Sequence, residues 1–176
     1  MSAYYSVAMG LAILLGSLLI SSCAGDDVEH DPQEVEISDP DQPWNSLIEY
    51  WGEHEPSELP EGHASMAAVI WFDSEVQNGG LGQYFHNNGF GQIGYLRTGL
   101  ETLDASQHAK LLETALSRIE TQHGPIANIS DAKGQEISDL DIDDLDSEYS
   151  LLDPTLTALV EAEVTGNEAN YRRGSR

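Results

Sequence analysis

The chain has 176 residues, which is enough for one domain with its own hydrophobic core. Its 31 acidic residues against 7 Lys and Arg give a formal net charge of −24, and the pI is near 4.1. Such a surface repels nucleic acid and anionic lipid, so direct nucleic-acid binding is excluded, whereas basic proteins and divalent cations are attracted. The composition leaves open whether the acidity serves a basic partner or only solubility in a salty habitat.

The N-terminus carries the pattern of an export signal. Residues 7–20 form an apolar run that is shorter than the roughly 20 residues of a membrane-spanning helix. The segment Ile20-Ser21-Ser22-Cys23 then resembles a bacterial lipobox, in which cleavage precedes the cysteine and its thiol is lipidated. Cys23 is the only cysteine, so no intrachain disulfide can form. Residues 2–10 lack Lys and Arg, which leaves a plain secreted protein or an uncleaved anchor as alternatives.

We therefore expect a lipoprotein signal peptide at residues 1–22 and a membrane-anchored lipoprotein of the bacterial cell envelope, attached through lipid on Cys23. Ala24 after the cysteine resembles lipoproteins of the outer membrane, in a cell that has one. Residues 23–43 are acidic, contain three prolines and hold few large apolar groups. This composition cannot offset the entropy of ordering, so we expect a disordered tether.

Helical spacing of apolar residues continues through residues 44–170, and residues 171–176 read as a tail. The expected fold is an all-α, single compact multi-helix domain. Its predicted helices span residues 44–54, 62–78, 81–87, 93–103, 104–123, 141–152 and 154–166. Asp104 with Gln107 is expected to cap the fifth helix as a capping box, and Asp153 with Pro154 to begin the last.

The stretch from Glu75 to Gly94 holds six glycines, and two of its segments are turn signals. Asn78-Gly79-Gly80 and Asn87-Asn88-Gly89 both combine residues that tolerate positive φ. We expect a β-branched residue at Gly79 to be forced into positive φ and to destabilise the fold. A β-hairpin is the alternative, but the preceding segment lacks strict alternation, so a helix–turn–helix is favoured.

A family resemblance rests on this stretch. The pattern Glu75-Val76-x-Asn78-Gly79-Gly80-x-x-Gln83-Tyr84-Phe85-x-Asn87-x-Gly89 resembles the signature of a bacterial domain family of unknown function, named after a DNA-mimic protein and its C-terminal domain. The segment Leu145–Leu152 resembles a second, weaker element of the same family. Gln77, Leu81 and His86 depart from the expected pattern. The resemblance covers about residues 44–170 and implies nucleic-acid mimicry as a mode of binding.

Two groups of residues are candidates for contact with a partner. The motif group consists of Glu75, Asn78, Gly79, Gly80, Gln83, Tyr84, Phe85, Asn87 and Gly89. These polar groups and glycines can equally serve only to cap helix ends and pack closely at a turn. The acidic stripe consists of Glu136, Asp139, Asp143 and Asp146, which share one face if they lie on one helix, with carboxylates about 5–6 Å apart.

The sequence favours a non-enzymatic module that binds a basic protein. Common hydrolase, phosphate-loop and zinc motifs are absent, the histidines are scattered, and an EF-hand fails because Asp144 stands where glycine is needed. We therefore expect no cofactor and no metal. Because the lipobox exports the chain, a basic envelope or incoming protein, such as a toxin nuclease, fits better than an intracellular target. The alternatives are an enzyme using Glu75 and His86 as acid and base, and a structural lipoprotein without a specific ligand.

Overall fold

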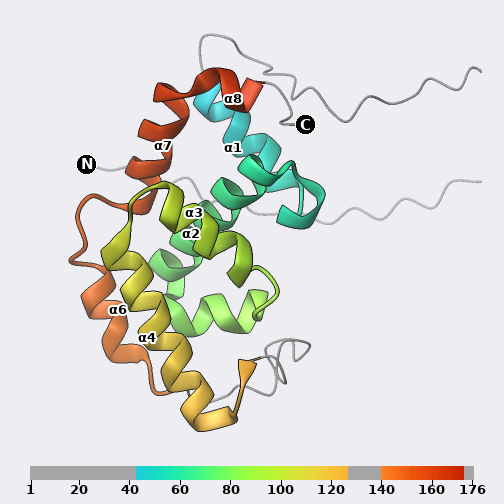
Figure 1. The fold of residues 1–176 in the computed structure, drawn as a ribbon. Helices are drawn as coiled ribbons and strands as arrows, with labels where there is room; N and C mark the ends of the chain where they lie inside the picture. Colours follow the sequence, from blue (N-terminus) through green and yellow to red (C-terminus); the bar gives the residue numbers. More distant parts are fainter. Residues whose placement is uncertain (1–42, 127–139, 173–176) are drawn as a thin grey trace, which may run out of the picture. The chain divides into compact units, whose positions relative to one another are not determined.

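The computed structural model describes residues 43–126 and 140–172, all of which belong to one compact unit. The predicted signal peptide, Cys23 and all of the tether except Pro43 lie outside the described residues. Within these ranges every regular element is a helix, which confirms the all-α prediction (Figure 1). The elements are α1 (Pro43–Glu53), a 3₁₀ turn η1 (Pro56–Glu58), α2 (Glu61–Asn88), α3 (Ile93–Thr102), α4 (Ser106–His123), α6 (Asp143–Tyr149), α7 (Leu156–Gly166) and α8 (Glu168–Arg172). None of these helices is long and apolar enough to cross a membrane.

The long helix α2 is the element against which most of the others pack. It contacts α1, α3, α6, α7 and α8, while α4 packs on α3 and α6 (Figure 1). Residues 63–69 of α2 are all buried; five of them are apolar, and the two polar residues are His63 and Ser65. This placement brings segments from both ends of the described chain onto one central helix.

Aromatic side chains fill much of the core. Trp51, Phe72, Tyr84 and Phe85 are fully buried, and the rings of Phe72 and Tyr84 meet edge to face at 4.8 Å between centroids. In α1 the tryptophans lie on the inward face, with Trp51 buried completely and Trp44 half-buried beside it.

The predicted capping box at Asp104 is wrong. Helix α4 begins only at Ser106, and Asp104 has φ 51°, so it ends the preceding helix instead. The Asp104 N–H donates to Glu101 O and the Ala105 N–H to Leu100 O, which is the bonding pattern of a Schellman motif. Asp tolerates the left-handed conformation that this motif needs better than most residues, because its short polar side chain can bond locally.

The predicted start of the last long helix is also displaced. Thr155, not Asp153, is the N-cap of α7, and its hydroxyl accepts from the Ala158 N–H at 3.3 Å. The residues after α7 form the short helix α8, in which Tyr171 is buried and meets the ring of Trp51 edge to face. Tyr171 therefore belongs to the core and not to the tail predicted from residue 171.

Candidate functional site

The glycine-rich stretch interrupts α2. Gly79 and Gly80 leave the helical conformation, and Gly80 has φ 84°, the left-handed region that favours glycine. The helix resumes at Leu81, whose backbone N–H donates to Asp146 Oδ1 at 2.8 Å. The first N–H groups of a helical segment lack partners within it, so this carboxylate from α6 caps the resumed segment. The predicted helix–turn–helix is thus present as one kinked helix.

The expected positive φ at Gly79 is wrong, because its φ of −162° is extended backbone. Gly79 is limited by space instead, since an added Cβ would lie 2.0 Å from Gln83 Oε1. Gly80 is limited by its φ and by Asp146, whose Oδ2 would lie 2.1 Å from an added Cβ.

The polar side chains of the motif bind one another across the kink. Gln83 Nε2 and Asn87 Nδ2 both donate to Glu75 Oε2, at 2.7 and 2.8 Å. One carboxylate before the kink is therefore joined to two amides after it. This arrangement fits the structural reading, in which the polar groups hold the turn. His86 is exposed and shares no hydrogen bond with Glu75 in the described structure.

The remaining motif residues divide between core and surface. Tyr84 and Phe85 are fully buried, so they cannot meet a partner without unfolding. Gly89 ends α2 with φ 61°, and its N–H donates to Phe85 O. Asn78 is exposed beside the kink. Partner binding by the surface members of the motif stays a prediction.

A buried carboxylate that the sequence analysis did not single out connects three helices. Asp73 of α2 is 1% exposed and accepts four hydrogen bonds. Its Oδ1 accepts from Tyr149 Oη of α6 at 2.5 Å and from Gln77 Nε2 at 2.8 Å. Its Oδ2 accepts from the Thr157 backbone N–H of α7 at 3.0 Å and from the Thr157 hydroxyl. All four donors are neutral, so they hold the charge without cancelling it.

The sequence does contain a signal for this carboxylate. Asp73 stands four residues after Val69 and three before Val76, and both valines are buried. A charged residue on the inward stripe of a helix must find hydrogen-bond donors, because burial of an unpaired charge is costly. Gln77 is a donor from the same helix, but Tyr149 and Thr157 lie more than 70 residues further along the chain, which the spacing within one helix cannot reveal.

A pocket of about 330 Å³ opens where α1, α2 and α7 meet, next to Asp73. Its apolar wall consists of Trp44, Ile48 and Ile70. Its polar lining consists of Asp73, Ser74, Gln77, Asn78 and Thr157. Asn78 is the one motif residue in this lining, so the pocket lies directly before the kink. This volume is at the small end of ligand sites, which suits a single side chain or small molecule.

The acidic stripe does not have the geometry that was expected. It requires one continuous helix, but α6 begins at Asp143, and Asp141 and Ile142 before it form a turn. Asp143 is exposed, whereas Asp146 is half-buried and is engaged by the Leu81 N–H. Glu136 and Asp139 lie outside the described residues.

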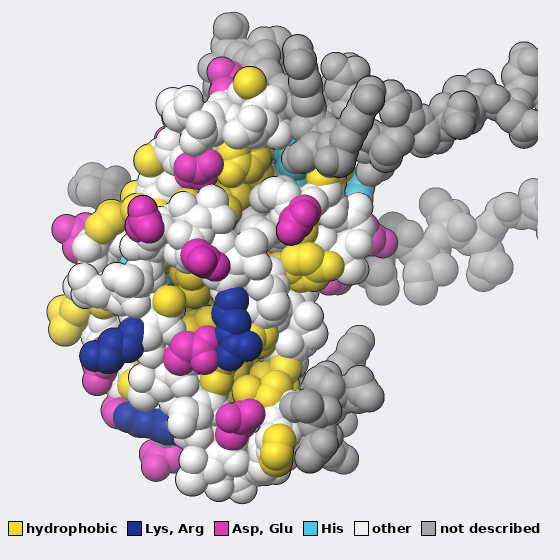
Figure 2. All heavy atoms as spheres, in the orientation of Figure 1, with side chains coloured by type: hydrophobic (Ala, Val, Ile, Leu, Met, Phe, Trp, Pro, Cys, Tyr) yellow, Lys and Arg dark blue, Asp and Glu magenta, His cyan; other side chains and the backbone are white. Residues whose placement is uncertain are grey.

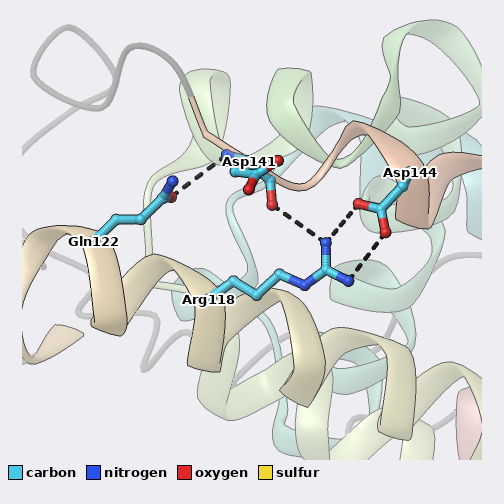
Figure 3. Close-up of polar contacts among 4 residues, drawn as sticks. All are labelled: Arg118, Gln122, Asp141 and Asp144. Carbon is cyan, nitrogen blue, oxygen red and sulfur yellow. Dashed lines mark hydrogen bonds and ion pairs between the residues drawn. The ribbon is translucent and has the colours of Figure 1, made fainter.

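The segment before α6 is held on α4 by an arginine (Figure 3). Arg118 donates to both carboxylate oxygens of Asp144 and, at 3.3 Å, to Asp141 O. The Asp141 N–H donates to Gln122 Oε1 at 3.4 Å. The carboxylate raises the pKa of Arg118, and the arginine lowers the pKa of Asp144, through their hydrogen bond. A second pocket of about 200 Å³ lies here, but its cation is already engaged by Asp144.

Positive charge is confined to one part of the described surface. The Lys and Arg side chains that the structure describes are Arg97 of α3 and Lys110 and Arg118 of α4. Arg97 is paired with Glu113 at 2.6 Å, as Arg118 is with Asp144. In Figure 2 the dark-blue side chains lie in the lower half of the visible face, and none is seen over α1 and α7. Within the described ranges, α1, α2 and α7 carry Asp and Glu without any Lys or Arg.

Comparisons with known proteins place the chain in one family. Searches of the curated proteins and of the solved structures gave no match. A scan against family models matched the DMP19-like protein family over residues 57–167, which includes the kinked helix, α6 and α7. Since that match covers more than half of the sequence, the chain belongs to the DMP19-like family, which is named for a DNA mimic protein.

Proposed function

We propose that this domain binds a basic, nucleic-acid-binding protein by presenting carboxylates where that protein would meet phosphates. The observation that carries the proposal is membership of a DNA-mimic family in a chain with a net charge of −24. A protein that binds DNA recognises it largely through Lys and Arg contacts to phosphate, and such contacts accept carboxylates as well. Membership of this family favours binding over catalysis. The hydrogen bonds from Gln83 and Asn87 to Glu75 also favour a structural role for this carboxylate over a catalytic one.

The surface formed by α1, the N-terminal part of α2 and α7 is the best candidate for the contact. None of the described Lys and Arg side chains lies on these helices, so no described cation on them competes with a basic partner. The α3–α4 surface carries Arg97 and Arg118 and suits such a partner less well. Long-range attraction by this asymmetric field would also speed association.

Displacement by DNA is the test of this function. The immobilised chain is incubated with basic proteins of its source, and bound protein is challenged with double-stranded DNA and with rising salt. Release by both is expected, because mimicry and DNA use the same surface of the partner and the contact is largely electrostatic. Binding that resists salt and is not displaced by DNA would contradict nucleic-acid mimicry.

We also propose that the domain works at a membrane, held by lipid on Cys23. The support is the sequence Ile20-Ser21-Ser22-Cys23 after an apolar segment of signal-peptide length. Cys23→Ser is expected to release the protein from the membrane fraction into the soluble fraction. Unchanged detergent partitioning of that variant would exclude lipid anchoring at this residue. With this location, an envelope or incoming basic protein is the natural partner.

A further inference from the structure

The pocket beside Asp73 contains an uncompensated negative charge. Asp73 is almost completely buried, and its four hydrogen-bond donors are neutral groups of Tyr149, Gln77 and Thr157. Among the described residues two titratable side chains are near it, Tyr149, whose pKa is raised by burial and by this carboxylate, and His108. Burial lowers the pKa of His108 although the charge of Asp73 opposes that shift, so the imidazole is neutral at pH 7. No ion pair within the described ranges includes Asp73.

The groups around this carboxylate leave several acceptor oxygens in the pocket lining. Gln77 Nε2 and the Thr157 hydroxyl each donate a hydrogen bond to Asp73. Their oxygen atoms therefore carry the acceptor capacity that remains, and hydrogen bonding to an anion makes those oxygens more negative. Asn78 adds a further amide oxygen at the same lining. Such a site suits a ligand that is a cation and offers several donors.

The opposite wall of the pocket is apolar and includes an indole. Trp44 and Ile48 of α1 face the lining from α2 and α7, and Trp44 is half-buried. A guanidinium group is flat, offers five N–H donors and stacks on aromatic rings, whereas an ammonium group is compact and strongly hydrated. Arginine is also enriched at the energetic centres of interfaces.

From these observations we propose that the α1–α2–α7 pocket receives one arginine side chain of a basic partner, with its guanidinium over Trp44 and its N–H groups toward Gln77, Asn78 and Thr157. The inference rests on the proposed function and deepens it, since it replaces a diffuse acidic surface with one specific contact. Trp44 and Ile48 lie before residue 57, so these two residues of the apolar wall come from outside the part of the chain that matches the family, whereas Ile70 lies within it.

A single added cation tests the pocket. Asn78→Lys places an ammonium group at the pocket lining, where it competes with an incoming guanidinium, and Asn78 is exposed, so the change should not disturb folding. Gln107→Lys on α4 changes the net charge by the same amount at an exposed position on a helix that does not line the pocket. Binding of a fluorescent hexa-arginine peptide to the full chain is measured by anisotropy at low salt. Asn78→Lys is expected to weaken binding roughly tenfold or more, and Gln107→Lys about twofold at most.

The indole provides a second, independent readout. Trp44→Leu keeps an apolar wall but removes the ring, so it should weaken hexa-arginine binding more than hexa-lysine binding. Equal weakening by the two lysine variants, or equal affinity of the unchanged protein for the two peptides, would overturn the arginine pocket while leaving mimicry by diffuse charge intact. Failure of the unchanged protein to bind either hexa-arginine or any basic protein would instead remove the proposed function as well.

Discussion

At the scale of single residues, Gly80 is constrained both by its backbone angle and by the carboxylate that faces it. Its φ is 84°, and an added Cβ would lie 2.1 Å from Asp146 Oδ2. Gly80→Ala should therefore strain the backbone and displace the side chain that caps Leu81. We expect it to lower the free energy of unfolding by about 2 kcal/mol or more, measured by urea denaturation.

The matched control for this prediction is two residues away. An added Cβ at Gly82 would meet nothing within 4 Å, and the backbone there is helical. Gly82→Ala should leave the free energy of unfolding unchanged or raise it by up to about 1 kcal/mol, because alanine favours a helix. Equal losses in the two variants would contradict the assignment of the kink to Gly80.

His63 makes the stability of the fold depend on pH. It is fully buried, its Nδ1 accepts from Trp51 Nε1 at 3.0 Å, and its Nε2 has no partner among the described residues. Burial lowers its pKa from 6.5 to about 4. Since the unfolded chain takes up the proton first, stability is lost as the pH falls from about 6.5 to about 4, by about 3 kcal/mol for this group alone.

The variant His63→Gln separates this contribution from the carboxylates, which titrate in the same range. Glutamine can still accept from Trp51 but does not titrate, so the fall in melting temperature between pH 7 and pH 4.5 should be smaller than in the unchanged protein. Identical pH profiles for the two proteins would show that His63 is not kept neutral by the fold.

At the scale of elements, the approach of α3 to α2 depends on Gly99. An added Cβ there would lie 2.5 Å from Val69 Cγ2 and 2.6 Å from Ser65 O, and the backbone oxygen cannot move aside. Gly99→Ala should push the two helices apart and lower the free energy of unfolding by about 1–3 kcal/mol in spite of its better helix propensity. Gly94→Ala on the same helix meets nothing within 4 Å and should be neutral or stabilising in the same thermal or urea experiment.

The sequence predicted the helices well because their signal is local. Apolar residues at helical spacing mark the buried face of α1 and of α4, where for example Leu112 and Ile119 are buried. The sequence did not predict the helix ends correctly, because the groups that cap a helix end can come from distant parts of the chain. Leu81 is capped by a carboxylate 65 residues away, and Asp104 adopts the conformation that ends α3.

The candidate site follows the same division between local and distant contacts. The motif from Glu75 to Gly89 located the kink, because glycine and asparagine mark a turn in any context. The pocket could not be predicted, because the hydrogen bonds that hold Asp73 in place come from Thr157 of α7 and Tyr149 of α6, which only the tertiary structure brings next to it. A hydrogen-bonded network of this kind is a property of the tertiary structure.

At the scale of the whole molecule, the charge of −24 must oppose folding by self-repulsion. The ion pairs Arg97–Glu113 and Arg118–Asp144 are both exposed, and exposed pairs contribute little. Salt screens both effects, but the repulsion involves many more charges, so it should dominate. We expect the free energy of unfolding in urea to rise by about 1 kcal/mol or more between 10 mM and 500 mM NaCl, which corresponds to about 2–4 °C in melting temperature.

Neutralising exposed carboxylates tests whether repulsion is the cause. Glu49, Glu101 and Glu161 are exposed on three different helices. Replacing all three by Gln makes the net charge less negative without removing a buried group. The triple variant should be more stable than the unchanged protein at 10 mM NaCl and should gain less from added salt, because less repulsion remains to be screened. An equal gain from salt in both proteins would mean that NaCl acts through something other than these charges, and the acidity would then be no burden on the fold.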